Sequence, residues 1–149
     1  MRSTESRTAL VVESELLELR RYRQLLLGAG FEQVLAAGSG AEALTMMATE
    51  LVHLVLTPWE TRELSGLELL RALRRRGRNR NVPVVILDHG LPQQTIVAAV
   101  KAGVAGRLRL PADAAKLKKV LTAIAAGAQP TAGESKHSGA PAGESGRKV

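Results

Sequence analysis

The sequence predicts an α/β domain in which helices pack on a buried parallel β-sheet. Short apolar runs alternate with amphipathic stretches along most of the chain, which is typical of repeated strand and helix units. Apolar residues make up 45% of the 149 residues and aromatic residues only 2%. The core must therefore consist of Leu, Val, Ile and Ala, as in sheets that are covered on both faces. The length fits one domain with a tail.

The first strand and helix are expected at residues 8–13 and 15–27. The first segment is short and apolar, as a buried strand is. In the second segment Leu16 and Leu19 recur with helical spacing, and arginines occupy another face. Two glycines close to the last leucine are expected to end this helix.

The second and third pairs are expected at 32–37 with 40–49 and at 52–57 with 66–76. The strand at 32–37 is weakly marked, whereas 52–57 is nearly all apolar. We expect Pro58 to stop that strand, because proline has no backbone N–H to donate.

The last two pairs are expected at 82–87 with 92–102 and at 106–110 with 112–126. The segment 82–87 is the clearest strand of the chain, and the helix after it has a proline in its first turn. From residue 127 the composition shifts to Gly, Ala, Pro, Ser, Glu and Lys without an apolar period. We therefore expect one domain at 1–127, and a disordered tail or the stub of a linker at 128–149.

The composition excludes several classes of protein. The chain has no cysteine, so thiol catalysis, disulfides and thiolate metal sites are ruled out. The first apolar run is broken at Glu13 and is too short for a signal peptide, and no run approaches the length of a membrane span. We therefore expect a soluble, cytoplasmic protein without a membrane partner. The net charge of +7 favours acidic partners or nucleic acid without choosing between them.

Several motifs in order resemble the receiver domain of bacterial response regulators, in particular the single-domain chemotaxis regulators. The motifs are Leu10-Val11-Val12-Glu13, Gly66-Leu67-Glu68-Leu69-Leu70, Pro83-Val84-Val85-Ile86-Leu87, Ala102-Gly103-Val104-Ala105-Gly106 and Pro111. The resemblance extends from residue 10 to about residue 125. It implies a doubly wound, flavodoxin-like sheet of order 2-1-3-4-5, with the functional crevice at the carboxyl ends of the strands. It also implies a role in two-component, phosphorelay-type signal transduction.

The family's phosphorylation chemistry fails at the matching positions of this chain. In the family, an aspartate at the end of the third strand accepts the phosphoryl group, and an acidic pair after the first strand holds magnesium. Pro58, which has no nucleophile, stands at the position of this aspartate. Glu13 and Ser14 stand at the positions of the acidic pair, so only one of the two carboxylates is present. Leu110 stands at the position of the family's phosphate-binding lysine, and Asp88 stands at the position of its switching hydroxyl residue.

The resemblance therefore points to a degenerate pseudo-receiver that works through protein contacts and is not an enzyme. Arg107 matches the position of the family's switching aromatic residue. Neither residue that moves in the family is therefore present to couple the crevice to the surface. The expected partner surface is basic and contains small residues, which suits an acidic protein partner. Its residues are Gln94, Thr95, Ala98, Lys101, Ala102, Arg107, Arg109, Lys116 and Lys119.

The runner-up hypothesis is a nucleic-acid-binding regulator that uses the basic run from Arg71 to Arg80. With helical spacing, four arginines of the run share roughly one face. They are Arg71, Arg74, Arg75 and Arg78. The alternative is a solvated helix end, since cations stabilise a helix C-terminus and no aromatic residue lies between the arginines to stack on bases.

A third hypothesis is a receiver-fold sensor in which a small ligand occupies the crevice. Glu13, Glu60 and Asp88 are expected at one rim, where they could bind a divalent cation weakly or remain solvated carboxylates. His53 is expected to be structural. We expect no catalytic residue, cofactor or bound metal.

Overall fold

The computed structural model describes residues 6–61, 63–75, 77–128 and 130. Strands and helices alternate from the first to the last element. The strands are β1 (Thr8–Val12), β2 (Gln33–Ala37), β3 (Leu54–Pro58), β4 (Val84–Asp88) and β5 (Gly106–Arg109). The helices are α1 (Leu16–Gly28), α2 (Gly40–Met47), α3 (Gly66–Arg75), α4 (Gln93–Ala102) and α5 (Ala114–Ala125).

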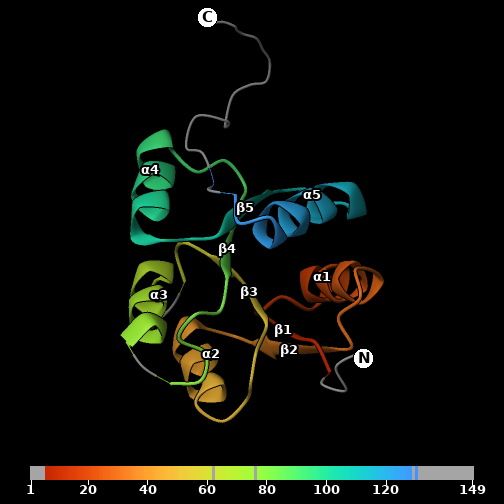
Figure 1. The fold of residues 1–149 in the computed structure, drawn as a ribbon, viewed down its shortest axis with the longest axis horizontal. Coiled ribbons are helices and arrows are strands. Elements are labelled where there is room, and N and C mark those ends of the chain that lie inside the picture. The colour runs from red at the N-terminus through yellow and green to blue at the C-terminus, as the bar shows by residue number, and fades with distance from the viewer. Residues whose placement is uncertain (1–5, 62, 76, 129, 131–149) are drawn as a thin grey trace, which may run out of the picture.

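The strands form one parallel sheet of order β2-β1-β3-β4-β5. Helices α1 and α5 cover one face of this sheet, and α2, α3 and α4 cover the other (Figure 1). The predicted fold class and strand order are therefore confirmed. Because the strands are parallel, their carboxyl ends meet at one edge, where ligands bind in doubly wound folds.

The core has one layer on each face of the sheet. Successive residues of a strand point to opposite faces, so Leu10 and Val12 pack toward α2 and α3, and Ala9 and Val11 pack toward α1 and α5. Both layers are almost free of aromatic side chains, as the composition predicted. The exceptions are Trp59 in the first layer and the aromatic residues Tyr22 and Phe31 in the second.

Two local predictions were wrong. The strand β3 was expected to end before Pro58, but it includes Pro58 as its last residue. Pro58 pairs there with Leu87 of β4. At the end of a strand proline costs at most one ladder hydrogen bond. In α1 the buried residues are Tyr22 and Leu26, whereas Leu16 is 77% exposed. Leu16 lies roughly 120° around the helix from Tyr22, because an α-helix turns about 100° per residue.

The predicted tail at 128–149 lies outside the described residues, apart from Ala128 and Pro130. Among the described residues, no helix is long and apolar enough to cross a membrane.

Candidate functional site

The carboxyl ends of the strands place the residues of the expected crevice at one edge of the sheet. Glu13 follows β1, Pro58 ends β3, Asp88 ends β4 and Leu110 follows β5. Pro58 carries an aliphatic ring, which cannot form an acyl phosphate. Ser14 is exposed, and the Glu13 Oε2 atom accepts a hydrogen bond of 3.0 Å from the backbone N–H of Glu15 at the start of α1.

The loop after β3 is packed against the core. The indole of Trp59 is 8% exposed and belongs to the core layer under α2 and α3. The N–H of Gly66 donates to the Trp59 carbonyl over 2.7 Å, and a Cβ at Gly66 would lie only 3.0 Å from the Pro58 carbonyl. On the other side the N–H of Gly40 donates to the Thr61 hydroxyl over 3.2 Å. These contacts hold the loop close to Pro58.

Asp88 is a buried carboxylate whose two oxygens face different groups. Its side chain is 3% exposed. The Oδ1 atom accepts hydrogen bonds from the backbone N–H groups of Gly90 and Leu91, at 2.9 and 2.8 Å. The Oδ2 atom lies 3.6 Å from Arg107 Nε and 3.9 Å from Arg109 Nε. Asp88 therefore links the loop before α4 to the edge strand β5.

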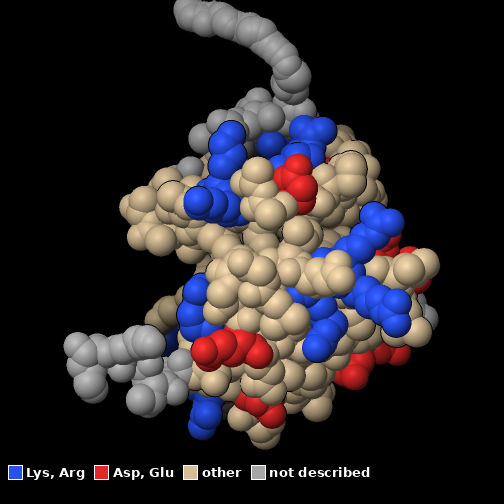
Figure 2. All heavy atoms as spheres, turned by 90° about the vertical axis from the view of Figure 1, so that its right-hand side faces the viewer, with Lys and Arg blue, Asp and Glu red and all other residues tan. Residues whose placement is uncertain are grey.

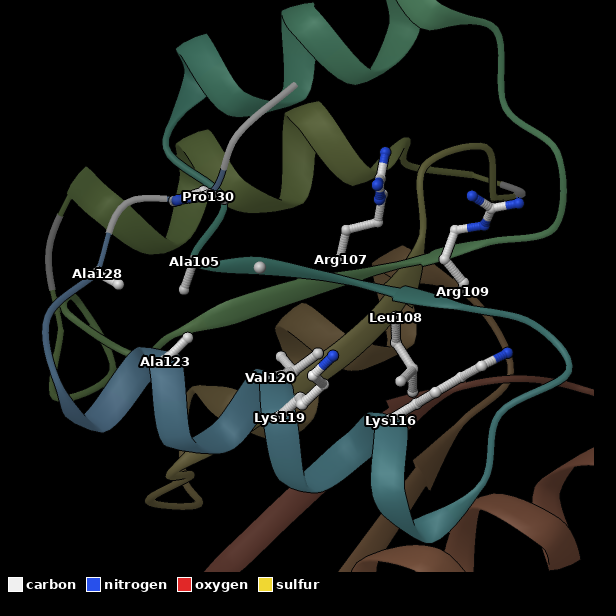
Figure 3. A pocket seen from close by; sticks show the side chains of 11 residues that line it. Ala105, Arg107, Leu108, Arg109, Lys116, Lys119, Val120, Ala123, Ala128 and Pro130 are labelled. Atoms are coloured by element: carbon white, nitrogen blue, oxygen red, sulfur yellow. The ribbon is translucent and has the colours of Figure 1, made fainter. Parts of the chain in front are cut away.

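The two arginines project from the same face of β5, on the side of α4, while Leu108 points toward α5 (Figure 3). They differ in burial, since the Arg107 side chain is 12% exposed and that of Arg109 is 48% exposed. Arg107 Nη1 is the only buried side-chain polar atom in the described chain without a hydrogen-bond partner. The Arg107 cation is thus held in the protein mainly by the charge of Asp88.

The residues at this edge do not fit the magnesium ion that the resemblance implies. Magnesium requires several hard oxygen ligands in octahedral geometry. No group of three or more His, Asp or Glu side chains that could hold a metal ion occurs in the described part of the chain. The expected rim of Glu13, Glu60 and Asp88 is therefore not a metal cluster, because the basic side chains of β5 lie against the Asp88 carboxylate.

A groove of about 530 Å³ runs along β5 and α5 and contains part of the expected partner surface (Figure 3). Four predicted cations line it, together with apolar residues, and no carboxylate of the described residues does. The cations are Arg107, Arg109, Lys116 and Lys119. The predicted surface residues on α4 do not line this groove; Gln94, Ala98 and Lys101 are exposed, and Thr95 and Ala102 are half-buried. On the face formed by α1 and α5, basic side chains are scattered among uncharged and acidic ones (Figure 2).

The basic run of α3 does not form one helical face. The helix ends at Arg75, and Gly77 with φ +103° turns the chain, so Arg78 does not continue the row of Arg71, Arg74 and Arg75. Burial lowers the pKa of Arg74, whose Nη1 donates to the Arg80 carbonyl over 3.0 Å. One cation of the expected nucleic-acid surface therefore supports the loop after α3.

His53 is structural, as the sequence indicated. It precedes β3, and its Nδ1 accepts a hydrogen bond of 3.0 Å from the backbone N–H of Thr8. The backbone N–H of His53 donates to the Thr8 carbonyl over 2.8 Å. The imidazole therefore helps to align β1 with the start of β3.

Sequence reasoning missed a second pocket of about 440 Å³, between α1 and the segment after β5. Its polar lining consists of Glu13, Glu18, Arg21, Tyr22 and His89. The one available signal was the i, i+4 spacing of Glu18 and Tyr22, which places them on one side of the helix.

Comparison with known proteins identifies the family. Residues 9–122 match the response regulator receiver domain. The chemotaxis protein CheY of Pseudomonas aeruginosa is 30% identical over 115 residues, which cover 77% of this chain and 93% of that protein. CheY-3 of Vibrio cholerae is also 30% identical over 115 residues, with 77% and 88% coverage.

Solved structures show the same fold. A putative response regulator from Chloroflexus aurantiacus has a TM-score of 0.73 at 23% identity, covering 82% of this chain and 99% of its own. The receiver domain of the sensor histidine kinase PA1611 from Pseudomonas aeruginosa, solved with magnesium in its active-site cleft, has a TM-score of 0.69 at 21% identity, with 79% and 96% coverage. The chain is a member of the response regulator receiver domain family, and it is a receiver domain of two-component signalling with CheY-like relatives.

Proposed function

We propose that this receiver domain acts without aspartyl phosphorylation, as a cytoplasmic, non-enzymatic protein-interaction module of a two-component pathway. The observation that carries the proposal is Pro58 at the carboxyl end of β3, where the family's phosphoacceptor would lie. A proline ring cannot form an acyl phosphate. The interaction module spans residues 1–127, and 128–149 serve as a tail or linker.

The pair of Asp88 and Arg107 supports a single constitutive state. These residues occupy the positions that the resemblance matches to the family's switching hydroxyl and aromatic. Here they are opposite charges, buried and 3.6 Å apart. Separating them would leave an uncompensated charge in the protein, which is strongly unfavourable. Signalling then depends on the amount or location of the protein rather than on its chemical state.

The groove along β5 and α5 supports an acidic protein partner. Arg109, Lys116 and Lys119 provide cations at its wall, and none of the described residues that line it is a carboxylate. An acidic segment would be steered by this field and would bind with a salt-sensitive association rate. The same surface extends to Thr95, Ala98 and Lys101 on α4. Nucleic acid is the weaker alternative, because Arg74 is engaged with the Arg80 carbonyl and Arg78 lies beyond the end of α3.

The phosphorylation claim is tested by incubating the protein with acetyl phosphate, or with beryllofluoride, in the presence of magnesium. We expect no added phosphoryl group by mass spectrometry and no change in the fluorescence of Trp59, the only tryptophan of the chain. Pro58→Ala is the matched control, since it also lacks a nucleophile and should behave in the same way. A saturable, magnesium-dependent fluorescence change in the unsubstituted protein would refute the proposal.

A further inference from the structure

The second pocket contains a buried phenol whose hydroxyl has no hydrogen-bond partner among the described residues. Tyr22 is 3% exposed and lines this pocket. No hydrogen bond joins its hydroxyl to any of the described residues. The hydroxyl is not among their buried polar atoms without a partner. The hydroxyl is therefore accessible to solvent, and it forms its hydrogen bond with water or with a ligand.

Two carboxylates, those of Glu13 and Glu18, line the same pocket as Tyr22. Burial, with the charges of Glu13 and Glu18, raises the pKa of Tyr22 to about 12, so the phenol stays neutral over the physiological range. Glu18 forms no ion pair with the described residues, and Glu13 uses one oxygen for the N–H of Glu15. The pocket therefore holds carboxylate and phenol oxygens that lack cationic partners.

The rest of the lining selects the kind of ligand. Leu25, Leu110 and Ala112 provide apolar contact area. Arg21 and His89 also line the pocket, but both are exposed, where solvent screens their charge. Glu13 and Glu18 are half-buried, so their charges are less screened by solvent than those of the exposed basic side chains, and the lining favours a cation. A metal ion is not indicated, because the described acidic and histidine side chains form no metal-binding group.

We infer that this pocket binds a small organic amine. Its ammonium group lies against the Glu13 and Glu18 carboxylates and the Tyr22 oxygen, and its apolar body lies against Leu25 and Leu110. The volume of about 440 Å³ is within the range of small-molecule sites. The site does not overlap the groove along β5 and α5, so the inference is independent of the proposed partner contact.

Tyr22 is the only tyrosine of the chain, so incorporation of meta-fluorotyrosine places a single fluorine label in the pocket. The probe is benzylamine, titrated into the full chain and followed by fluorine NMR. Benzyl alcohol and benzoate are the neutral and anionic controls of the same size. We expect a saturable shift with benzylamine and a much weaker one with either control. Equal shifts with benzyl alcohol, or no saturable shift with benzylamine, would overturn the assignment.

A matched pair of variants tests the role of the carboxylates. Glu18→Gln should weaken benzylamine binding about two- to fivefold, the effect of one partly solvated charge contact. Glu32→Gln removes the same charge at an exposed position before β2 and should leave the affinity unchanged. Equal losses in the two variants would show only a general charge effect and would reject the site.

The same ammonium chemistry could come from a lysine of a partner protein. Nα-acetyl-lysine methylamide provides that group and is titrated in parallel. Tighter binding of this compound than of benzylamine would reject the small-molecule site in favour of a protein lysine. Weaker binding would support the inference.

Discussion

The buried pair of Asp88 and Arg107 allows a quantitative test of the constitutive state. Asp88→Ala removes the carboxylate that faces an 88% buried cation, and it removes the acceptor of two backbone N–H groups. Breaking one partner of a buried pair costs about 3–5 kcal/mol. We expect the free energy of unfolding to fall by that amount. Arg109 contributes little to this figure, because it is half exposed and its Nε lies 3.9 Å from the carboxylate.

Further variants separate charge from hydrogen bonding. Asp88→Asn keeps an oxygen that can accept from Gly90 and Leu91, so it should lose less, about 2 kcal/mol. Arg107→Met removes the cation together with its orphaned Nη1 atom. The double variant Asp88→Asn with Arg107→Met should lose at least about 1 kcal/mol less than the sum of the two single losses, because neither charge is then left alone.

Urea unfolding of the unsubstituted protein and the four variants, followed by circular dichroism, measures these free energies. Arg71→Met is the control, since it removes an exposed arginine and should change stability by no more than about 0.5 kcal/mol. Hydrogen exchange at the Gly90 and Leu91 amides reports on the loop before α4 and should accelerate in Asp88→Ala. Strictly additive losses in the double variant would show that Asp88 and Arg107 are not coupled. This result would refute the proposed single constitutive state.

Three other predictions follow from single contacts. Asn79→Ala should lower the free energy of unfolding by about 2–4 kcal/mol, because the buried side chain donates to the Met47 and Glu50 carbonyls and accepts from the Val52 N–H; urea unfolding measures the loss. Tyr22 has a pKa raised to about 12 against about 10 in the unfolded chain, so its contribution is complete below pH 10 and lost as the pH rises toward 12. Stability should fall by up to about 2–3 kcal/mol in that window, and an unchanged stability would contradict the raised pKa. Lys119→Glu should weaken binding of an acidic partner by slowing its association, while the same change at Lys118, which does not line the groove, should have less effect; association rates at two salt concentrations decide between them.

The sequence by itself determined the architecture. Apolar runs of strand length alternate with amphipathic stretches, and that pattern is local, so five strand and helix pairs could be placed within one or two residues of most observed ends. The sequence also shows that position 58 is a proline, which lacks a nucleophile in any fold. Both conclusions depend on residue type and short-range spacing.

Only the tertiary structure decided which side chains meet. Asp88 and Arg109 are far apart in the chain and become neighbours through the parallel register of β4 and β5. The pocket around Tyr22 requires α1 to pack near the segment after β5, and the exposure of Leu16 depends on how α1 is rotated on the sheet. Sequence spacing predicts which residues share a face. The packing of distant elements determines which of those faces are buried and which charges they bring together.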